Sequence, residues 1–79
     1  MAPDKILDAK GLMCPMPIMK TSQAVRELPV DGVLEILATD PASKPDMEAW
    51  CKMTGNELLS ASEEPGTPKV YRFTVRKKK

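Results

Sequence analysis

The sequence is organised around residues 15–28, PMPIMKTSQAVREL, a stretch without glycine that predicts an amphipathic helix. A step of 100° per residue places four side chains on one face of this helix: Ile18, Thr21, Val25 and Leu28. Pro15 and Pro17 lie in the first turn, where backbone N–H groups have no helical partner and proline is tolerated. The Pro29–Gly32 turn ends the pattern. We therefore expect a helix of about four turns with one buried face.

Four segments around this helix have the character of β-strands. Residues 5–9 form a short run that ends at a Lys-Gly turn, and residues 57–62 form a second short run. Residues 33–39, VLEILAT, are almost continuously apolar, which is typical of a strand in the middle of a sheet. Residues 70–76 alternate between polar and apolar side chains, as a half-buried strand does. Their apolar side consists of Tyr71, Phe73 and Val75.

Residues 44–54 predict a second helix. Ser43 is the expected N-cap, with Asp46 three residues further on in an approximate capping box, and Gly55 is expected to end the helix. One side of this helix holds Met47, Trp50, Cys51 and Thr54. A proline-rich turn at residues 63–68 separates the last two strands. The order of elements is therefore βαβαββ, and the fold class is α/β in the α+β sense.

The composition limits the class of protein. A chain of 79 residues fits one domain, which we expect to span residues 1–79. The chain has no histidine, which excludes imidazole catalysis and His-ligated metal sites, and two cysteines cannot supply a four-ligand zinc site. Without the last four residues, eight basic and eleven acidic side chains give a net charge of −3. That sign argues against direct binding of nucleic acid.

The ends of the chain and its cysteines indicate a cytoplasmic protein. No apolar stretch approaches the ~20 residues that cross a bilayer, and residues 1–10 are too polar for a signal peptide, so we expect no membrane insertion. In a reducing cytosol, Cys14 and Cys51 are expected to be free thiols. The basic tail, residues 77–79, is expected to be disordered, either as a solvated end or as a segment that steers the chain to an acidic partner.

Residues 11–17, GLMCPMP, place Cys14 at the start of the first predicted helix. The N-terminus of a helix presents unpaired N–H groups and the positive end of its dipole, which favour a thiolate, and Lys10 is the one cation close in sequence. Because Pro15 and Pro17 carry no N–H, we expect only a modest lowering of the Cys14 pKa. Their fixed φ angles should hold the sulfur in one direction. The alternative is a buried cysteine that fills the helix start as a small apolar side chain.

Three side chains elsewhere on the two helices bear on the role of Cys14. Met16 and Met19 lie roughly opposite the apolar face of the first helix, so they should be exposed beside Cys14. Together with Lys10 they could form a docking surface for partner proteins, although exposure without a role is an open alternative. Cys51 lies on the side of the second predicted helix that faces the protein core. We therefore expect it to have a structural role rather than to act as a resolving thiol.

The loop that contains Asp40 follows the strand predicted at residues 33–39. If that strand is a parallel neighbour of residues 5–9, the carboxyl ends of both strands meet, and Asp40 lies near the loop that contains Cys14. The negative charge of Asp40 could then disfavour a second negative charge on Cys14. Alternatively, Asp40 could cap the helix that follows. We favour the cap.

Residues 8–17, DAKGLMCPMP, resemble the signature of the TusA/SirA-like sulfur carriers, in which the cysteine of a CPxP motif opens the first helix. The likeness continues through Asp40-Pro41-Ala42, Trp50-Cys51 and the closing strand, and it covers Ile6 to Lys77. The motif gains specificity from the Gly-Leu that precedes it and from the short βαβαββ chain. The resemblance implies a two-layer sandwich, with both helices on one face of a four-stranded mixed sheet. Asn56 departs from the pattern, because many members have histidine there.

The resemblance also implies a function. Cys14 would carry sulfur as a covalent persulfide, without a cofactor or a metal, and Gly11, Pro15 and Pro17 would support the motif. The sulfur would come from a cysteine desulfurase or a rhodanese-type donor and pass to a DsrE-like acceptor, towards tRNA thiolation or sulfur oxidation. We expect a carrier without independent turnover rather than an enzyme. The alternatives are a small enzyme or transporter partner that processes thiosulfate through Cys14, and a redox-regulatory binding module.

Overall fold

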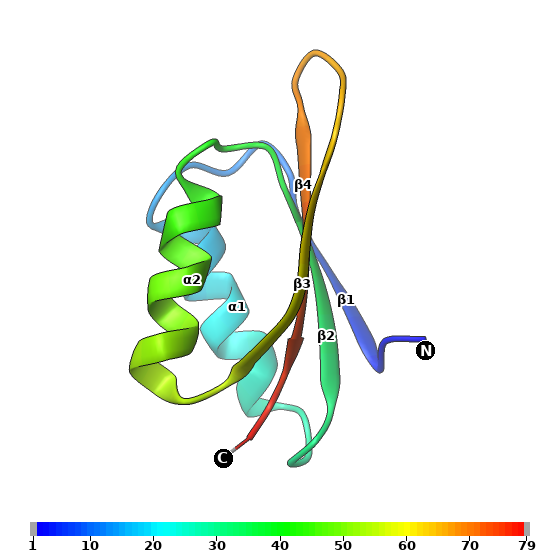
Figure 1. Cartoon of the computed structure of the whole chain (residues 1–79), viewed down its shortest axis with the longest axis vertical. Helices are drawn as coiled ribbons and strands as arrows, with labels where there is room; N and C mark the ends of the chain where they lie inside the picture. Colours follow the sequence, from blue (N-terminus) through cyan, green and yellow to red (C-terminus); the bar gives the residue numbers. More distant parts are fainter. Residues whose placement is uncertain (1, 79) are drawn as a thin grey trace.

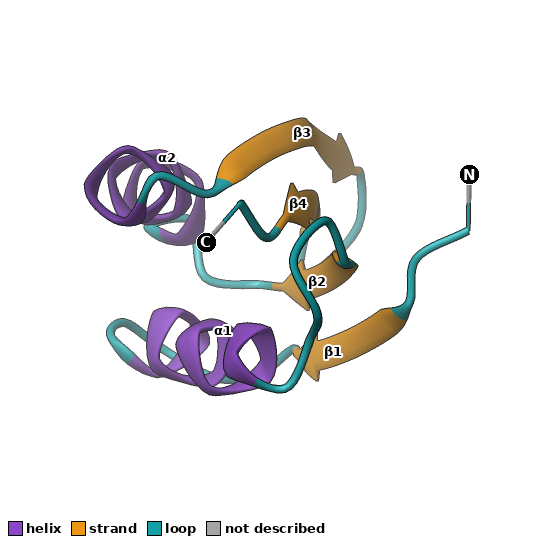
Figure 2. Cartoon of the chain, turned by 90° about the horizontal axis from the view of Figure 1, so that it is seen from below, coloured by secondary structure: helices purple, strands orange, loops and turns teal. Residues whose placement is uncertain are grey.

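The computed structural model describes residues 2–78, which form four strands and two helices in the order βαβαββ. The elements are β1 (Lys5–Ala9), α1 (Met16–Arg26), β2 (Val33–Ala38), α2 (Ser43–Thr54), β3 (Glu57–Glu64) and β4 (Val70–Arg76). Figure 1 shows these elements, and the strands make one sheet in the order β1-β2-β4-β3 (Figure 2). β1 and β2 are parallel, whereas β4 is antiparallel to both β2 and β3. The expected mixed sheet and element order are confirmed.

Both helices lie on the same face of the sheet, so the fold is a two-layer sandwich (Figure 2). α1 packs against β1 and β2, and α2 packs against α1 and the start of β3. β2 lies in the interior of the sheet, as its apolar sequence predicts, because β1 covers one of its edges and β4 covers the other. The opposite face of the sheet carries ion pairs such as the one between Arg72 and Glu35.

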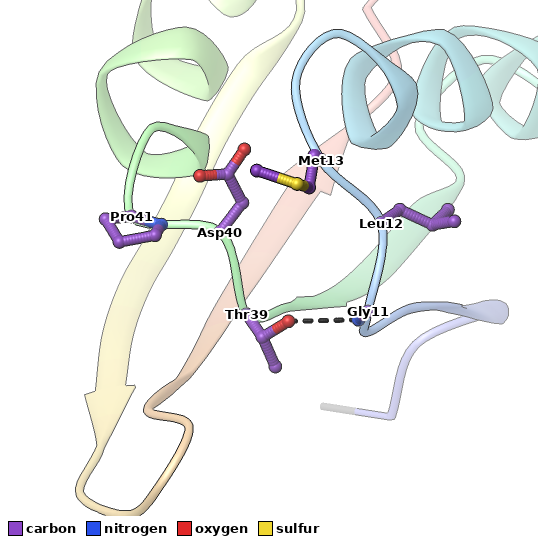
Figure 3. A pocket seen from close by; sticks show the side chains of 6 residues that line it. All are labelled: Gly11, Leu12, Met13, Thr39, Asp40 and Pro41. Atoms are coloured by element: carbon purple, nitrogen blue, oxygen red, sulfur yellow. Dashed lines mark hydrogen bonds between the residues drawn. The ribbon is translucent and has the colours of Figure 1, made fainter.

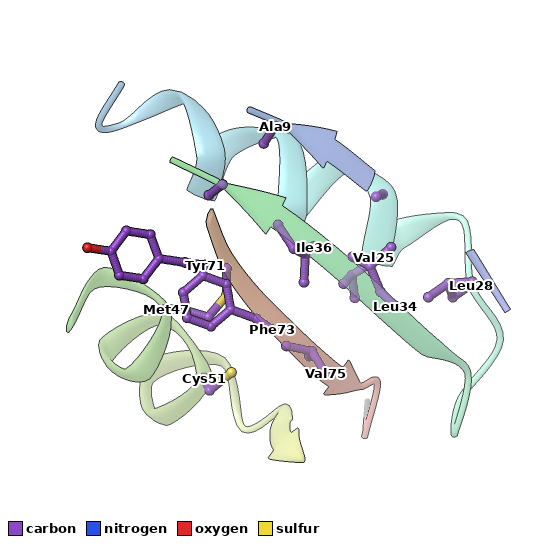
Figure 4. Packing of buried hydrophobic residues seen from close by; sticks show 12 residues of the cluster. Ala9, Val25, Leu28, Leu34, Ile36, Met47, Cys51, Tyr71, Phe73 and Val75 are labelled. Atoms are coloured by element: carbon purple, nitrogen blue, oxygen red, sulfur yellow. The ribbon is translucent and has the colours of Figure 1, made fainter. Parts of the chain in front are cut away.

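The core lies between the helices and the two central strands (Figure 4). Along β4, every second residue is buried, as the alternation predicts. The side chains that are less than 2% exposed include Phe73, Leu34, Ile36, Met47 and Val75. α1 adds buried residues from the face predicted by its periodicity, and Ile18 packs against the edge of this cluster. Burial of one face of each helix therefore holds the two layers together.

The bounds of the first helix differ from those predicted. α1 begins at Met16 because Pro15 (φ −95°, ψ 11°) is its N-cap, and the Pro15 carbonyl accepts the Met19 N–H (3.1 Å). The helix ends at Arg26, before the predicted Leu28. Beyond it the N–H groups of the next two residues bond to carbonyls only three positions earlier, which tightens the last turn.

The start of the second helix was also predicted one residue late, and the predicted N-cap is wrong. Ser43 lies within α2, and Ala42 is the N-cap. The Ser43 side chain is buried, with no hydrogen-bond partner among the described residues. No side chain caps α2. Asp40 instead closes the turn before the helix, because its carbonyl accepts the Ser43 N–H (2.9 Å) and its Oδ1 accepts the Ala42 N–H (3.1 Å). At the other end of α2, Gly55 adopts the left-handed conformation (φ 81°), as predicted.

The third strand is longer than predicted, and the basic tail is more ordered. β3 extends to Glu64 because its last residues pair with the start of β4. Beyond β4, the Lys77 carbonyl accepts the Asp31 N–H (2.6 Å), and Lys77 Nζ donates to the Leu28 carbonyl (2.7 Å). Lys78 is hydrogen-bonded to the loop after α2. The expectation of disorder at 77–79 is therefore wrong for Lys77 and Lys78, and Lys79 lies outside the described residues.

Candidate functional site

The candidate site is formed by the loops at the carboxyl ends of β1 and β2, which lie side by side because the two strands are parallel. Two hydrogen bonds join the loops (Figure 3 shows the first). The Gly11 N–H donates to Thr39 Oγ1 (2.9 Å), and the Cys14 N–H donates to Asp40 Oδ2 (2.7 Å). The expected approach of the Asp40 loop to the Cys14 loop is therefore confirmed.

Gly11 makes this approach possible. Its φ of +83° lies in the left-handed region, which costs glycine nothing but strains other residues. A Cβ at this position would meet no atom within 4 Å, so the requirement for glycine comes from the backbone conformation rather than from space. Gly11 thus turns the chain from β1 into the loop that presents Cys14.

Cys14 lies in a turn just before α1 rather than inside the helix, and its side chain is exposed. The Met16 N–H is not free for a thiolate, because it donates to the Met13 carbonyl (2.8 Å) and closes a turn around the cysteine. Pro15 and Pro17 offer no N–H. The alternative of a buried Cys14 that fills the helix start is wrong.

The predicted lowering of the Cys14 pKa is also wrong, because the structure raises this pKa above its ordinary value. The largest cause is a hydrogen bond with the carboxylate of Asp46, which favours the thiol over the thiolate. Partial desolvation and the negative charges of Asp46 and Asp40 act in the same direction. Of the two roles considered for Asp40, the favoured one as a helix cap is wrong, because α2 has no side-chain cap hydrogen bond. Its charge instead opposes a negative charge on Cys14.

The side chains predicted to surround Cys14 are exposed. Met16 is 38% exposed and Met19 is 49% exposed, and Lys10 is exposed without an ion pair in the described part of the chain. A third methionine, Met13, is 73% exposed and was not predicted as part of this surface. We call Met13, Met16 and Met19 the methionine surface. It offers flexible, polarisable side chains beside an exposed sulfur.

A pocket of about 180 Å³ lies beside this surface (Figure 3). It is lined by Gly11, Leu12, Met13, Thr39, Asp40 and Pro41, which come from the same two loops. Its lining combines apolar side chains with one carboxylate. Thr39 was predicted as the last residue of a strand, which ends at Ala38 instead, and Met13 was given no role, so neither was predicted to line a pocket.

The second cysteine has the predicted structural environment. Cys51 is part of α2 and lies in the core (Figure 4). It is 6% exposed, and burial raises the pKa of its thiol to about 11. Both cysteines are free, so a disulfide between them is absent, as expected. Asn56 lies after α2, where its Nδ2 donates to Thr54 Oγ1 (3.1 Å) and its Oδ1 accepts the Lys78 N–H (3.0 Å). Asn56 therefore lies at the C-terminal end of α2, whereas Cys14 lies near the loop that leads into the N-terminal end of this helix.

Two further observations concern metal binding and membrane crossing within residues 2–78. No group of three or more acidic, cysteine or histidine side chains is placed to hold a metal ion. No helix in this range combines the length and apolar character needed to cross a membrane. Together, the fold and the site define a small α+β protein that presents one exposed thiol between two carboxylates and a methionine surface.

Comparison with known proteins identifies the family. The family described as Sulfurtransferase TusA matches residues 5–77, so the chain belongs to the TusA family. The sulfur carrier protein TusA of Pseudomonas putida (strain W619) is 46% identical over 76 residues, which are 96% of this chain and 91% of that protein. The sulfur carrier protein TusA of Pseudomonas entomophila (strain L48) is 47% identical over 75 residues, which are 95% of this chain and 90% of that protein.

A solved structure supports the fold independently. The crystal structure of a SirA-like protein from Desulfitobacterium hafniense superimposes with a TM-score of 0.74 and 21% sequence identity. The match covers 95% of this chain and 99% of that one. The resemblance to the TusA/SirA-like family and the two-layer fold that it implies are therefore confirmed.

Proposed function

We propose that this protein is a sulfur carrier that holds sulfane sulfur as a persulfide on Cys14. The observation that carries the proposal is the exposure of Cys14 at the junction of two loops that fix its backbone, while the other cysteine is buried. Relatives over most of the chain length are named sulfur carriers, which supports the same role. The alternative of a redox-regulatory module lacks a resolving thiol near Cys14, because Cys51 faces the core.

Loading exchanges one sulfur atom without net oxidation. The Cys14 sulfur attacks the outer sulfur of a donor persulfide, an S–S bond forms at Cys14, and the S–S bond of the donor breaks. The proton of the Cys14 thiol ends on the sulfur that leaves the donor. This exchange requires only a nucleophilic sulfur that a second protein can reach, and an exposed Cys14 meets that requirement.

The donor in this proposal is a cysteine desulfurase or a rhodanese-type protein, and the acceptor is a DsrE-like protein. Both would dock on the methionine surface, where unbranched side chains adapt to partners of different shape, and Lys10 would contribute a rim charge. The sulfur would serve tRNA thiolation or sulfur oxidation in the cytoplasm, where thiols stay reduced. Neither nucleic acid nor a membrane takes part directly.

Mass spectrometry tests the proposal. The wild-type protein is incubated with glutathione persulfide, with thiosulfate or with hydrogen peroxide, beside Cys14→Ser and Cys51→Ala. A carrier gains about 32 Da per sulfur from the persulfide, at Cys14 only, and keeps it until an acceptor thiol is added. Sulfite and sulfide released in many turnovers from thiosulfate, with dithiothreitol added to that sample as the reductant, would instead indicate an enzyme. Oxygen adducts without sulfur loading would indicate a redox sensor. A Cys14→Ser protein that still loads would refute the assignment of the site.

A further inference from the structure

The pocket beside Cys14 is tied to the cysteine from both loops. Three of its lining residues, Gly11, Leu12 and Met13, lead directly into Cys14. Asp40, which lines the pocket from the other loop, accepts the Cys14 N–H at 2.7 Å. Because three covalent bonds separate the Cys14 nitrogen from its sulfur, Asp40 Oδ2 lies within roughly 7 Å of that sulfur in every rotamer. A ligand held in the pocket would therefore lie beside the reactive sulfur.

The polar groups that line the pocket mainly accept hydrogen bonds. The Gly11 N–H donates to Thr39 Oγ1 (2.9 Å), and the Leu12 N–H donates to a carbonyl of β1 (3.2 Å), so neither is free for a ligand. Pro41 has no N–H. The Asp40 carboxylate accepts two backbone N–H groups, which fix its orientation and leave its other lone pairs free. The pocket therefore suits a ligand that donates hydrogen bonds.

The pocket also carries a negative charge between apolar walls. Asp40 forms no ion pair with a lysine or arginine within residues 2–78. Leu12, Met13 and Pro41 supply the walls, and Figure 3 shows the Met13 side chain pointing toward the Asp40 carboxylate. Water screens a carboxylate between such walls less than one on an open surface, so this carboxylate attracts a cation more strongly. The lining is complementary to a small cation with a short apolar stem.

The volume of the pocket limits the size of this cation. An apolar cavity of about 150 Å³ holds one benzene molecule, so a pocket of about 180 Å³ accepts a ligand of similar size. We infer that the pocket binds the ammonium group of a low-molecular-weight aminothiol persulfide, and that this donor loads Cys14 directly. The inference rests on the proposed function, and it adds a small-molecule donor to the protein donors.

The dimensions of such a donor match the site. When two carbons separate the ammonium nitrogen from the inner sulfur, the outer sulfur is roughly 5 Å from the nitrogen. An ammonium group that donates to Asp40 therefore brings the outer sulfur within reach of Cys14. The Cys14 sulfur attacks the outer sulfur, an S–S bond forms at Cys14, and the S–S bond of the donor breaks. The Cys14 proton ends on the departing aminothiol, so atoms, charge and oxidation state balance.

The test compares three donors of similar size and different charge: the persulfides of cysteamine, mercaptoethanol and mercaptopropionic acid. Loading of Cys14 is followed by intact mass in a single turnover, and each rate is divided by that of the uncharged mercaptoethanol donor. Differences in the nucleophilicity of Cys14 between variants then cancel. Asp40→Asn should lower the relative rate of the cysteamine donor by about threefold to fivefold and raise that of the anionic donor. Glu48→Gln, which removes an exposed charge from α2, should leave both ratios unchanged.

A second variant tests the charge of the pocket without removing the hydrogen bonds of Asp40. Met13→Lys places a cation at an exposed lining position, so it should also abolish the preference for the cysteamine donor, and it replaces Asp40→Asn if that variant does not fold. Alkylation of Cys14 by iodoacetamide, an uncharged reagent, is followed against pH by peptide mass spectrometry. This alkylation profile shows whether each variant still presents Cys14.

Mixed disulfide formation repeats the charge series without sulfur transfer. Cystamine, hydroxyethyl disulfide and dithiodipropionic acid each leave one half of the disulfide on Cys14, and cystamine should show the same dependence on Asp40. Charge preferences in Asp40→Asn and Met13→Lys that equal those of the wild type would overturn the inference. A wild-type protein that takes up no sulfur from any persulfide would overturn the proposed function, while the disulfide series would still decide whether the pocket selects an ammonium group.

Discussion

Pro17 offers the sharpest test of how the start of α1 is built, because its ring is fully buried in the core. Replacement by alanine keeps Cβ and removes two ring carbons from a site that is less than 2% exposed. At about 0.8 kcal/mol per buried methylene, this removes about 1.6 kcal/mol of burial. The greater freedom of the unfolded chain adds about 0.4–1 kcal/mol. We therefore expect Pro17→Ala to lower the free energy of unfolding by about 2–3 kcal/mol.

Pro45→Ala is the matched control, because Pro45 also lies in the first turn of a helix but is exposed. It retains only the unfolded-state effect, so its loss should stay below about 1 kcal/mol. Urea unfolding of both variants, with equal slopes against urea, gives the two free energies. Equal losses for Pro17→Ala and Pro45→Ala would refute the reasoning, because burial of the Pro17 ring would then contribute nothing measurable.

Three further outcomes follow from the environments of other residues. Cys51→Ala should leave sulfur loading intact and lower the free energy of unfolding by about 1–2 kcal/mol, measured by urea unfolding, because it truncates a buried side chain. Because burial raises the pKa of the Cys51 thiol from 9.0 to about 11, its contribution to stability is complete below pH 9 and is lost as the pH rises towards 11. The melting temperature of the wild type should therefore fall over this range more steeply than that of Cys51→Ala; parallel curves would contradict it. Asn56→Ala should leave the alkylation profile of Cys14 unchanged, because the 12 residues of α2 place Asn56 about 18 Å from the entrance of that helix; a shifted profile would show a long-range effect.

The strands could be predicted because their signals are local. Alternation along residues 70–76 indicates a strand with one buried face, and β4 has this burial pattern. The apolar run from residue 33 indicates a strand in the interior of the sheet, and β2 lies there. The starts of the helices were less predictable. Ser43 has the chemistry of an N-cap, but the helix begins one residue earlier and makes Ala42 the N-cap, which no pattern in the local sequence indicates.

Some properties of the site follow from the local sequence, and others depend on residues that are distant in the sequence. The exposure of Met16 and Met19 follows from helical phase, whereas Met13 is exposed because of its place in an aperiodic loop. The predicted sign of the Cys14 pKa shift is wrong because the helix terminus does not outweigh the carboxylates of Asp46 and Asp40. The largest cause, Asp46, is far away in sequence and lies on α2, which packs beside α1. Electrostatics at this site therefore depend on tertiary structure, which the motif alone does not report.

Sulfur that passes through Cys14 can be followed in a single-turnover chase with labelled sulfur. A donor persulfide carrying ³⁵S loads the protein, the donor is removed, and an acceptor protein is added while peptides from both chains are separated and counted. The label should first appear on the peptide that contains Cys14 and then move to the acceptor with matching loss and gain. Label that reaches the acceptor equally well through Cys14→Ser, or that never leaves Cys14, would contradict transfer through Cys14.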